Sequence, residues 1–425
     1  MYICQECYQE ISDYFDYCKP CNSVHFRNNF IHWTSGDSNL DKVIQNSQLN
    51  ATIRLDIIEW IEYSNLENIE LIAHGGFGSV YKAIWKDGPI VSSQAWDLNK
   101  SEWKRENKKE VAVKKFQNVT IVSSDFLNEV NSNLKMNNKN GGFETIRIYG
   151  VTRDPQSGEY AIVIQFKNGG NLRKMIKENY SNLTWENILE ILNRISEGLD
   201  SVHESKCYHK DLHSGNILNK IYSDNTIGGS VISDFGLCCP MDQSSTDKTL
   251  YGVLPFVAPE VLLGKEFTEA ADIYGFGMIM SELISGEPPF VDREYDENLA
   301  LAICYGQRPQ IPEYTPEPYA ELMKRCWDHI PTNRPTANEL CIQFMNLFSV
   351  LDNNNNLIED RKLEIKEAFS QEREDKFRAR LAELATNPIP LKKSQNLLTS
   401  KRLDYSQSLS QKLSVEDWNK LKLTD

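Results

Sequence analysis

The sequence predicts an α+β protein in which strand patterns dominate the first part of the body and helix patterns dominate the second. Residues 71–81 and 111–114 read as strands, and residues 160–166 form another apolar strand. Residues 188–202 instead carry apolar side chains at helical spacing. Four of the ten cysteines lie within the first 21 residues, which indicates a small separate segment ahead of this body.

Length and composition limit the class of protein. The 425 residues allow one catalytic unit of about 250 to 300 residues with appendages, and a 40% hydrophobic content is enough for a sizeable core. A net charge of −14 argues against nucleic acid or an anionic membrane as partner. The chain has no run of 18 apolar residues and no signal-like start. We therefore expect a soluble, non-secreted protein of the reducing cytoplasm, or of the nucleus, without nucleic-acid or membrane partners.

The early cysteines form two knuckles, Cys4-x-x-Cys7 and Cys18-x-x-Cys21, with ten residues between them. Four thiolates at this spacing suit tetrahedral zinc, because each pair folds back and points two sulfurs at one ion. The alternatives are a redox pair or four free structural thiols. We expect a structural site, since four protein ligands leave no open coordination position and the metal would supply folding energy to so short a segment. The histidines that would replace a ligand are His25 and His32.

Three stretches outside the main strands and helices have a weaker pattern. Residues 36–62 predict one or two short amphipathic helices that dock on the next domain, with partner binding as the alternative. Residues 86–109 read as an inserted loop that tryptophans pack back onto the body. Residues 359–384 predict a helix of mixed charge, either packed on the body or used for coiled-coil or docking contacts. Residues 387–425 show little pattern.

A loop between the helix at 188–202 and a short apolar run places Asp211 and Asn216 five residues apart. This pair alone is a weak signal and more typical of an ordinary turn. A second carboxylate, Asp234, follows 18 residues after Asn216. The loop is therefore a candidate catalytic loop, and the rest of the chain decides between the two interpretations.

The strand region contains a glycine hairpin and a buried lysine. Gly75 and Gly78 stand where backbone approaches a neighbour closely, so their amides could lie over phosphates, although turn chemistry explains them equally well. Lys114 ends an apolar strand, so it lies at a solvent edge or is paired. Glu129, on a helix that residues 123–125 would cap, is a suitable partner.

Taken in order, these motifs resemble those of the protein kinase superfamily, and six motifs in the family's order make coincidence negligible. The chain looks similar to the tyrosine-kinase-like group and resembles a family expanded in some fungi. In that family two cysteine knuckles and a Glu-Trp-Ile stretch, here residues 59–61, precede the glycine-rich loop. The resemblance implies a bilobal protein kinase fold with a small β-rich N-lobe and a larger helical C-lobe. The expected parts are a zinc-knuckle segment at 1–30, a helical linker at 31–65, the kinase domain at 66–349, and a C-terminal helix with a disordered tail at 350–425.

Matched residue by residue, the resemblance implies ATP and Mg²⁺ as substrate and cofactor. Lys114 would contact the α and β phosphates while Glu129 holds it. Asp211 would accept the proton of the attacking hydroxyl, and Asn216 and Asp234 match the magnesium ligands. The residues that would surround the nucleotide are Ile72, Gly75, Gly78, Val80, Ala112, Lys114, Ile164, Phe166 and Leu218.

Further residues match the family in the C-lobe, and three positions depart from the family pattern. Glu260 and Arg334 resemble a buried ion pair, and Asp272 resembles the helix aspartate that braces the catalytic loop. The departing residues are Lys210 in place of arginine, His213 in place of the lysine that steadies the γ phosphate, and Val253 in place of threonine. His213 remains a candidate catalytic residue, although a neutral imidazole is a weaker electrostatic donor.

The resemblance implies a protein kinase that transfers the γ-phosphate of MgATP to serine or threonine hydroxyls of protein substrates in signalling. Tyrosine or dual specificity is the alternative, because neither specificity pattern is fully met. A pseudokinase scaffold, in which the knuckles or the tail recruit docking partners, is the alternative from another class. The five core residues Lys114, Glu129, Asp211, Asn216 and Asp234 are all present and favour an active enzyme.

Overall fold

The computed structural model describes residues 2–11, 17–75, 78–91, 95–116, 119–137, 144–179, 183–224, 226–240, 249–351, 359–387 and 398–412. The chain divides into two compact units, an N-terminal unit of residues 1–166 and a C-terminal unit of residues 167–425. The first is built on a sheet and the second is mainly helical, which confirms the predicted α+β class.

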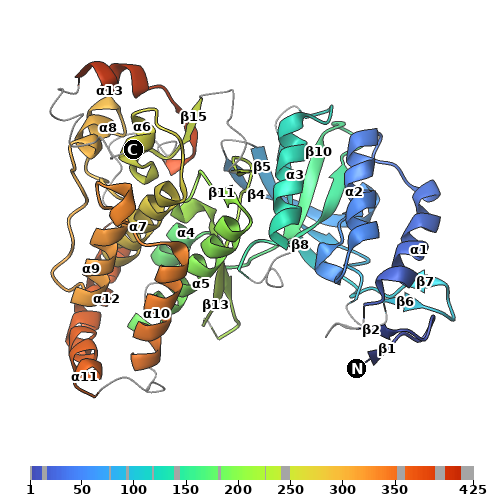
Figure 1. Ribbon diagram of the computed structural model, residues 1–425, viewed down its shortest axis with the longest axis horizontal. Coiled ribbons are helices and arrows are strands. Elements are labelled where there is room, and N and C mark those ends of the chain that lie inside the picture. Colours follow the sequence, from blue (N-terminus) through green and yellow to red (C-terminus); the bar gives the residue numbers. More distant parts are fainter. Residues whose placement is uncertain are drawn as a thin grey trace. The chain divides into compact units, whose positions relative to one another are not determined.

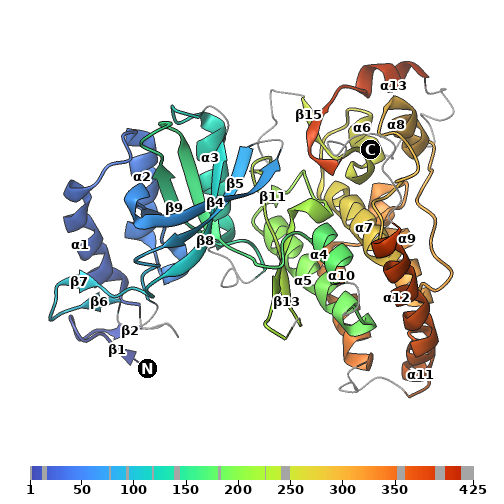
Figure 2. The same cartoon turned by 180° about the vertical axis from the view of Figure 1, so that it is seen from behind.

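The N-terminal unit contains helices α1 to α3 and strands β1 to β10 (Figures 1 and 2). The strands are β1 (Tyr2–Ile3), β2 (Glu10–Ile11), β3 (Glu59–Trp60), β4 (Leu66–Gly75), β5 (Gly78–Trp85), β6 (Trp96–Asp97), β7 (Glu102–Trp103), β8 (Lys109–Phe116), β9 (Ile148–Arg153) and β10 (Tyr160–Gln165). The helices are α1 (Lys19–Asn29), α2 (Ser38–Asn50) and α3 (Ser124–Asn137).

Six of these strands form one sheet in the order β3-β9-β10-β8-β5-β4. All neighbours pair antiparallel except β3, which runs parallel to β9. Gly78 has a φ of +156°, and a Cβ on it would lie 2.0 Å from the carbonyl oxygen of Lys115. The β4–β5 hairpin therefore requires glycine at this position.

Alternation along the strands supplies apolar side chains to both faces of the sheet. Tyr160 and Ile162 of β10 pack with α2 and α3, whereas Ala161 and Val163 belong to the cluster on the other face. Figure 1 shows α2 and α3 side by side. Asp37 begins α2 by accepting hydrogen bonds from two backbone amides of its first turn. The inner strands β9 and β10 are thus buried along most of their length, and β8 is buried along its middle.

The first 60 residues join the unit through aromatic contacts. The ring of Trp96, in the inserted loop, stacks on His25 of α1 with centroids 3.9 Å apart. Trp103 stacks on Phe26 at 4.3 Å. The predicted packing of these tryptophans is confirmed, and the surface that they contact is α1. Residues 36–62 hold the expected helix, α2, but they also contribute the short edge strand β3, which the helical expectation did not include.

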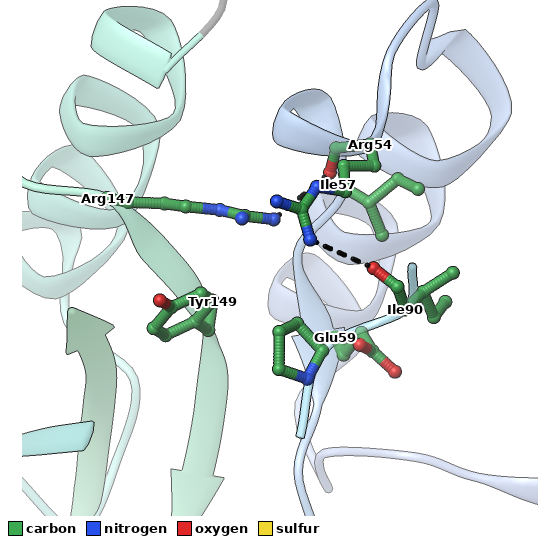
Figure 3. A pocket seen from close by; sticks show the side chains of 7 residues that line it. Arg54, Ile57, Glu59, Ile90, Arg147 and Tyr149 are labelled. Carbon is green, nitrogen blue, oxygen red and sulfur yellow. Dashed lines mark hydrogen bonds between the residues drawn. The ribbon is translucent and has the colours of Figure 1, made fainter. Parts of the chain in front are cut away.

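A small polar cavity lies between the segment before β3 and the start of β9 (Figure 3). Its volume is about 10 Å³, which is room for about one water molecule. Arg147 donates to the backbone oxygen of Arg54 at 3.3 Å, and its Nε has no partner among the described residues. Burial lowers the pKa of Arg147 to about 10. The guanidinium therefore stays charged at neutral pH, and a buried water would satisfy its remaining donor.

The C-terminal unit contains α4 to α13 and short strand pairs. Its helices are α4 (Leu172–Glu178), α5 (Trp185–Glu204), α6 (Pro259–Leu262), α7 (Glu269–Ser285), α8 (Glu297–Cys304), α9 (Glu317–Cys326), α10 (Ala337–Leu351), α11 (Glu359–Ala368), α12 (Gln371–Thr386) and α13 (Ser406–Lys412). Its strands are β11 (Cys207–Tyr208), β12 (Ile217–Ile221), β13 (Ile227–Ile232), β14 (Cys239–Pro240), β15 (Leu250–Gly252) and β16 (Lys401–Leu403).

Helix α7 is the core of this unit, because every residue from Ala271 to Ile284 is buried. It ends at Gly286, whose φ of +76° is the left-handed conformation common after a helix. Within the described residues, α7 included, we find no helix with the length and apolar character needed to cross a bilayer.

The expected helix at 359–384 is in fact two helices, α11 and α12, separated at Phe369 and Ser370. Phe369 is buried beside Trp185, with ring centroids 5.9 Å apart, and the Trp185 indole donates to the backbone oxygen of Ser370 at 3.3 Å. Phe377 of α12 stacks on Trp185 at 5.3 Å. These contacts place α12 against the body. Of the two interpretations of residues 359–384, a helix packed on the body and a coiled-coil or docking helix, the structure has the packed one.

Candidate active site

The predicted catalytic and nucleotide-contacting residues fall in both units, so each unit's set is described by itself. In the N-terminal unit, Lys114 of β8 and Glu129 of α3 form an ion pair with Nζ and Oε1 2.6 Å apart. Both side chains are buried. Of the two alternatives that the sequence left for Lys114, the structure has the paired one, as burial of an ammonium group requires.

The predicted nucleotide-facing residues of this unit lie on adjoining strands. Val80 of β5 is opposite Lys114 of β8, and Ala112 is opposite Ile164 of β10. Residues that face each other across neighbouring strands point to the same side, so these four side chains share one face of the sheet. Ile72 lies at an irregularity of β4 and is exposed.

Two of the remaining predicted contacts lie at the ends of this set. Gly75 pairs with Gly78 at the tip of the β4–β5 hairpin, so the two glycines that the sequence singled out are brought together. Phe166 follows β10, and the ammonium of Lys82 lies 4.9 Å from the centre of its ring. The tip of the β4–β5 hairpin and the end of β10 thus lie at the margins of the sheet face that carries Lys114.

In the C-terminal unit, Asp272 of α7 holds the loop that contains Asp211. Its two carboxylate oxygens accept the backbone amides of His209 and Lys210 at 2.9 and 3.0 Å, and His203 contacts it at 3.0 Å. Lys210 has a φ of +68°, which costs energy in a non-glycine residue and requires such bracing. The aspartate expected to brace the loop makes these contacts.

The Asn216 side chain is hydrogen-bonded to Asp211. Its amide nitrogen donates to the Asp211 backbone oxygen at 2.9 Å and to the carboxylate at 3.3 Å. The backbone amide and hydroxyl of Ser233 both donate to the Asn216 carbonyl at 2.9 Å. Ser233 precedes Asp234, which has a φ of +66°. The two predicted magnesium ligands therefore stand on segments that are joined by the two hydrogen bonds from Ser233 to the Asn216 carbonyl.

His213 lies beside Asp211 in a defined orientation. Its Nδ1 accepts the backbone amide of Gly215 at 3.0 Å, so in the neutral ring the proton sits on Nε2. Nε2 is 3.6 Å from the nearer carboxylate oxygen of Asp211. A neutral His213 thus still presents an N–H toward the aspartate, which a lysine would do with a full charge.

The Asp211 carboxyl is buried, and burial alone would raise its pKa. The nearby charge of His213 and hydrogen bonds from His213 and Ser400 outweigh burial and lower the pKa of Asp211 below its ordinary value. The group is accordingly a carboxylate at neutral pH, in the state that can accept a proton.

Glu260 of α6 and Arg334, which precedes α10, form a buried ion pair in the C-terminal unit. Arg334 donates to both carboxylate oxygens of Glu260 at 2.7 and 2.8 Å and to backbone oxygens of Asp328 and Ala270.

Val253 is buried at the start of the segment that leads to Glu260. Leu218, the predicted nucleotide contact of this unit, lies half-buried on β12. Because Lys210 keeps a positive charge in the loop, the sequence leaves regulation through a phosphate on Ser244, Ser245, Thr246 or Thr249 open. The first three lie outside the described residues, and Thr249 immediately precedes β15.

The four early cysteines converge. Their sulfur atoms all lie within 4.8 Å of one another, with Cys4 and Cys21 3.8 Å apart and Cys7 and Cys18 3.7 Å apart. Four sulfurs about 2.3 Å from a central zinc would be about 3.8 Å apart, so the donor set fits a tetrahedral ion. His25 bonds to Glu6 instead, at 2.9 Å.

Sequence reasoning missed Ser400. Its hydroxyl lies 2.5 Å from the Asp211 carboxylate and 3.3 Å from Nε2 of His213. Ser400 precedes β16, in a region where the sequence shows little pattern. A sequence signal there is the pair Leu403 and Leu409, apolar residues in a mostly polar stretch, both of which are buried.

Comparisons with known proteins agree with this geometry. Residues 66–344 match the family model described as protein tyrosine and serine/threonine kinase. A probable serine/threonine-protein kinase of Dictyostelium discoideum is 28% identical over 67% of this chain and 16% of its own length. Mitogen-activated protein kinase kinase kinase 10 of Xenopus laevis is 28% identical over 73% of this chain and 30% of its own length. The dual specificity protein kinase splA of D. discoideum is 27% identical over 66% and 11%. The chain thus spans less than a third of each of these relatives.

Proposed function

Because the chain belongs to the family of protein tyrosine and serine/threonine kinases, we propose that it transfers the γ-phosphate of MgATP to serine and threonine hydroxyls of protein substrates. One observation carries the proposal: Asp211 is a buried carboxylate on a loop that Asp272 braces, and Asn216 is bonded to it. Relatives named as serine/threonine kinases support the specificity.

The residues of the C-terminal unit divide the work as follows. Asp211 accepts the proton of the attacking hydroxyl and orients its oxygen toward the phosphorus atom. Its lowered pKa keeps it ionised and able to accept that proton. Asn216 and Asp234 would hold magnesium, which when bound neutralises charge on the phosphates. His213 donates from Nε2 toward the same place and supplies part of the stabilisation that a lysine would give.

In the N-terminal unit, Lys114 is kept in one position by Glu129 and would bind the α and β phosphates. The hairpin amides near Gly75 and Gly78 would lie over the phosphates, and Val80, Ala112 and Ile164 on the same strand face would contact the base. Positioning and charge neutralisation are most of what phosphoryl transfer requires, and this set provides both.

The test is a phosphotransfer assay with the full chain, labelled MgATP and a generic acceptor protein. Asp211→Asn keeps the size of the side chain but removes the base, so we expect the rate to fall by about a hundredfold or more. Asp292→Asn, the same change at an exposed position, should leave the rate unchanged. Equal label incorporation by wild type and the Asp211 variant would refute the enzyme assignment.

The same samples decide between the specificities and between enzyme and scaffold. We expect phosphoserine and phosphothreonine among the labelled amino acids, whereas phosphotyrosine alone would contradict the specificity. A chain that binds MgATP but transfers no label would be a pseudokinase, with His213 and Val253 as the first residues to restore toward the family pattern.

The cysteine cluster supports a further part of the proposal, a structural zinc ion held by Cys4, Cys7, Cys18 and Cys21. Four sulfurs at the spacing of a tetrahedron leave no open position, so the ion would stabilise the first segment and take no part in the reaction.

Metal analysis of the full chain tests the zinc site. We expect about one zinc per chain, and loss of most of it in Cys21→Ser, because three thiolates bind more weakly than four. Cys341→Ser, at a cysteine far from the cluster in sequence, should keep the full amount. Chelation should free the Trp96 and Trp103 rings from α1 and change tryptophan fluorescence. Zinc content near zero under reducing conditions would rule the site out.

A further inference from the structure

The tail segment, residues 398–412, lies against the part of the C-terminal unit that carries Asp211. Strand β16 of this segment pairs antiparallel with β15, with Gly252 opposite Lys401 and Leu250 opposite Leu403. Strand β15 precedes Val253 and the segment that leads to the Glu260–Arg334 pair. The tail segment thus takes the place of an extended peptide added to an open strand edge.

The register of this strand pair places Ser400, the residue before Lys401, against Asp211 of the catalytic loop. The Ser400 hydroxyl donates a hydrogen bond to the Asp211 carboxylate, with the two oxygens 2.5 Å apart. The hydroxyl oxygen lies 3.3 Å from Nε2 of His213. Since the neutral His213 ring carries its proton on Nε2, the hydroxyl has an acceptor on one side and a donor on the other. This is the arrangement of a nucleophile beside its general base.

Backbone geometry allows the close approach. Gly252 has a φ of +154°, and a Cβ on it would come within 3.9 Å of an Asp211 carboxylate oxygen and 2.9 Å of the Val257 side chain. The absence of a side chain at this position lets β15, and the strand paired with it, run directly past the carboxylate.

Contacts along the whole tail segment hold it in this register. Leu403 and Leu409 are buried, and Lys412 forms an ion pair with Glu297 of α8 at 2.7 Å. At the other end, Arg173 donates to the backbone oxygen of Leu398 at 3.4 Å. The buried Leu403 opposes a register shift of β16 by one residue, because such a shift would turn this leucine away from the body.

We propose that Ser400 is a phosphorylation site of the chain's own reaction, with the tail segment as a substrate delivered in cis. The proposal rests on the proposed kinase function. The Ser400 oxygen attacks the γ-phosphorus of ATP and forms a new O–P bond, while the bond from that phosphorus to the β-phosphate oxygen breaks and ADP leaves. The proton of the hydroxyl passes to the Asp211 carboxylate.

The product is less stable in this position than the substrate. A phosphate on Ser400 would bring a second negative charge against the buried Asp211 carboxylate, and like charges in so dry a place repel strongly. Phosphorylation therefore releases β16 from β15 and opens the strand edge to other peptides.

The experiment incubates the full chain with MgATP and maps phosphorylated residues by mass spectrometry, alongside a separate assay with a generic acceptor protein. We expect phosphate on Ser400 at a rate per molecule that stays constant over a roughly hundredfold range of protein concentration, as an intramolecular reaction requires. Ser400→Ala should lose this site, and Ser400→Thr should be phosphorylated at the new threonine. Ser408→Ala, which removes a hydroxyl bonded to Tyr405 in the same segment, should behave as wild type.

The possible failures are distinct. Phosphorylation of the acceptor protein with Ser400 unmodified would overturn this proposal and leave the kinase function intact. A Ser400 rate that rises in proportion to protein concentration would show transfer between molecules and would overturn delivery in cis. Label on neither the acceptor protein nor Ser400 would refute the kinase function, and this proposal would fall with it.

Discussion

Neighbouring lysines of β8 show how residue position determines chemistry. Lys114 and Lys115 point to opposite faces of the sheet, as successive strand residues do. Lys114 pairs with Glu129 and Lys115 pairs with Asp154. The first pair lies among the predicted nucleotide contacts, and the second ties β8 to the end of β9. We assign the first pair to function and the second to stability.

Asp154 gives a pH-dependent prediction for stability. Burial alone would raise its pKa, but hydrogen bonds from Lys115 and from the Gln156 amide hold the pKa below its ordinary value. A carboxylate with a depressed pKa contributes stability above its unfolded pKa and loses it as the pH falls through the folded one. Asp154→Asn should therefore cost about 2 kcal/mol at pH 7 in denaturant unfolding, and the difference from wild type should shrink toward acid. A difference that grows on acidification would contradict this assignment.

Residue-scale prediction from sequence succeeded where the signal is local. The spacing of Cys4, Cys7, Cys18 and Cys21 indicated their convergence. The apolar strand around Lys114 left a solvent edge or a pair as the alternatives, with Glu129 as a suitable partner, and the pair is the one found. Ser400 could not be found in this way, because its hydrogen bond to Asp211 spans 189 residues of sequence. Only the register of a strand pair brings these two residues together.

At the scale of elements, α7 and α12 meet at a glycine. A Cβ on Gly286, at the end of α7, would lie 2.3 Å from a methyl carbon of Leu381 and 3.1 Å from one of Leu384. The left-handed turn after α7 therefore also provides the surface on which α12 packs.

Gly286→Ala should destabilise the chain through both backbone strain and the clash with α12. Gly306 separates the two effects, because its φ is +91° but a Cβ there would meet nothing within 4 Å. We expect Gly306→Ala to cost about 1 kcal/mol from strain alone, and Gly286→Ala to cost about 1–3 kcal/mol more. Chemical denaturation of both variants measures this, and equal costs would mean that α12 yields without penalty.

Two elements show why boundaries were harder to predict than the elements themselves. The break between α11 and α12 depends on Phe369 and Ser370, which contact Trp185 nearly two hundred residues earlier. The strand β3 exists because β9 offers it a parallel partner. Neither partner can be read from the local pattern of residues 359–384 or 36–62, because each lies far away in the sequence.

At the scale of the whole chain, the family motifs predicted the main body well, and the region after it was harder to place. The tail beyond residue 349 was expected to be a helix and a disordered stretch. The described residues there instead form two packed helices, a strand and a further helix. The domain boundary at residue 349 remains a prediction. The contacts of α12 with Trp185 mean that it can be tested by removing α11 and α12.

Shortened chains test that boundary. A chain ending at residue 351 would expose Trp185 and leave its backbone amide without the Glu374 carboxylate, which accepts it at 2.7 Å. We expect its melting temperature to fall by about 5 °C or more relative to a chain ending at residue 387, since burial of large aromatic rings is lost. Both chains lack the tail segment, so their comparison isolates α11 and α12. Equal melting temperatures would show that the body is complete at 351.

The pairing of β16 with β15 also affects competition between substrates. A peptide that is part of the same chain is present at an effective concentration of roughly millimolar, whatever the concentration of the protein. A separate peptide that binds this strand edge weakly would be excluded until the tail segment leaves. Apparent affinity for protein substrates should therefore be lower than intrinsic affinity by the fraction of molecules in which the edge is open.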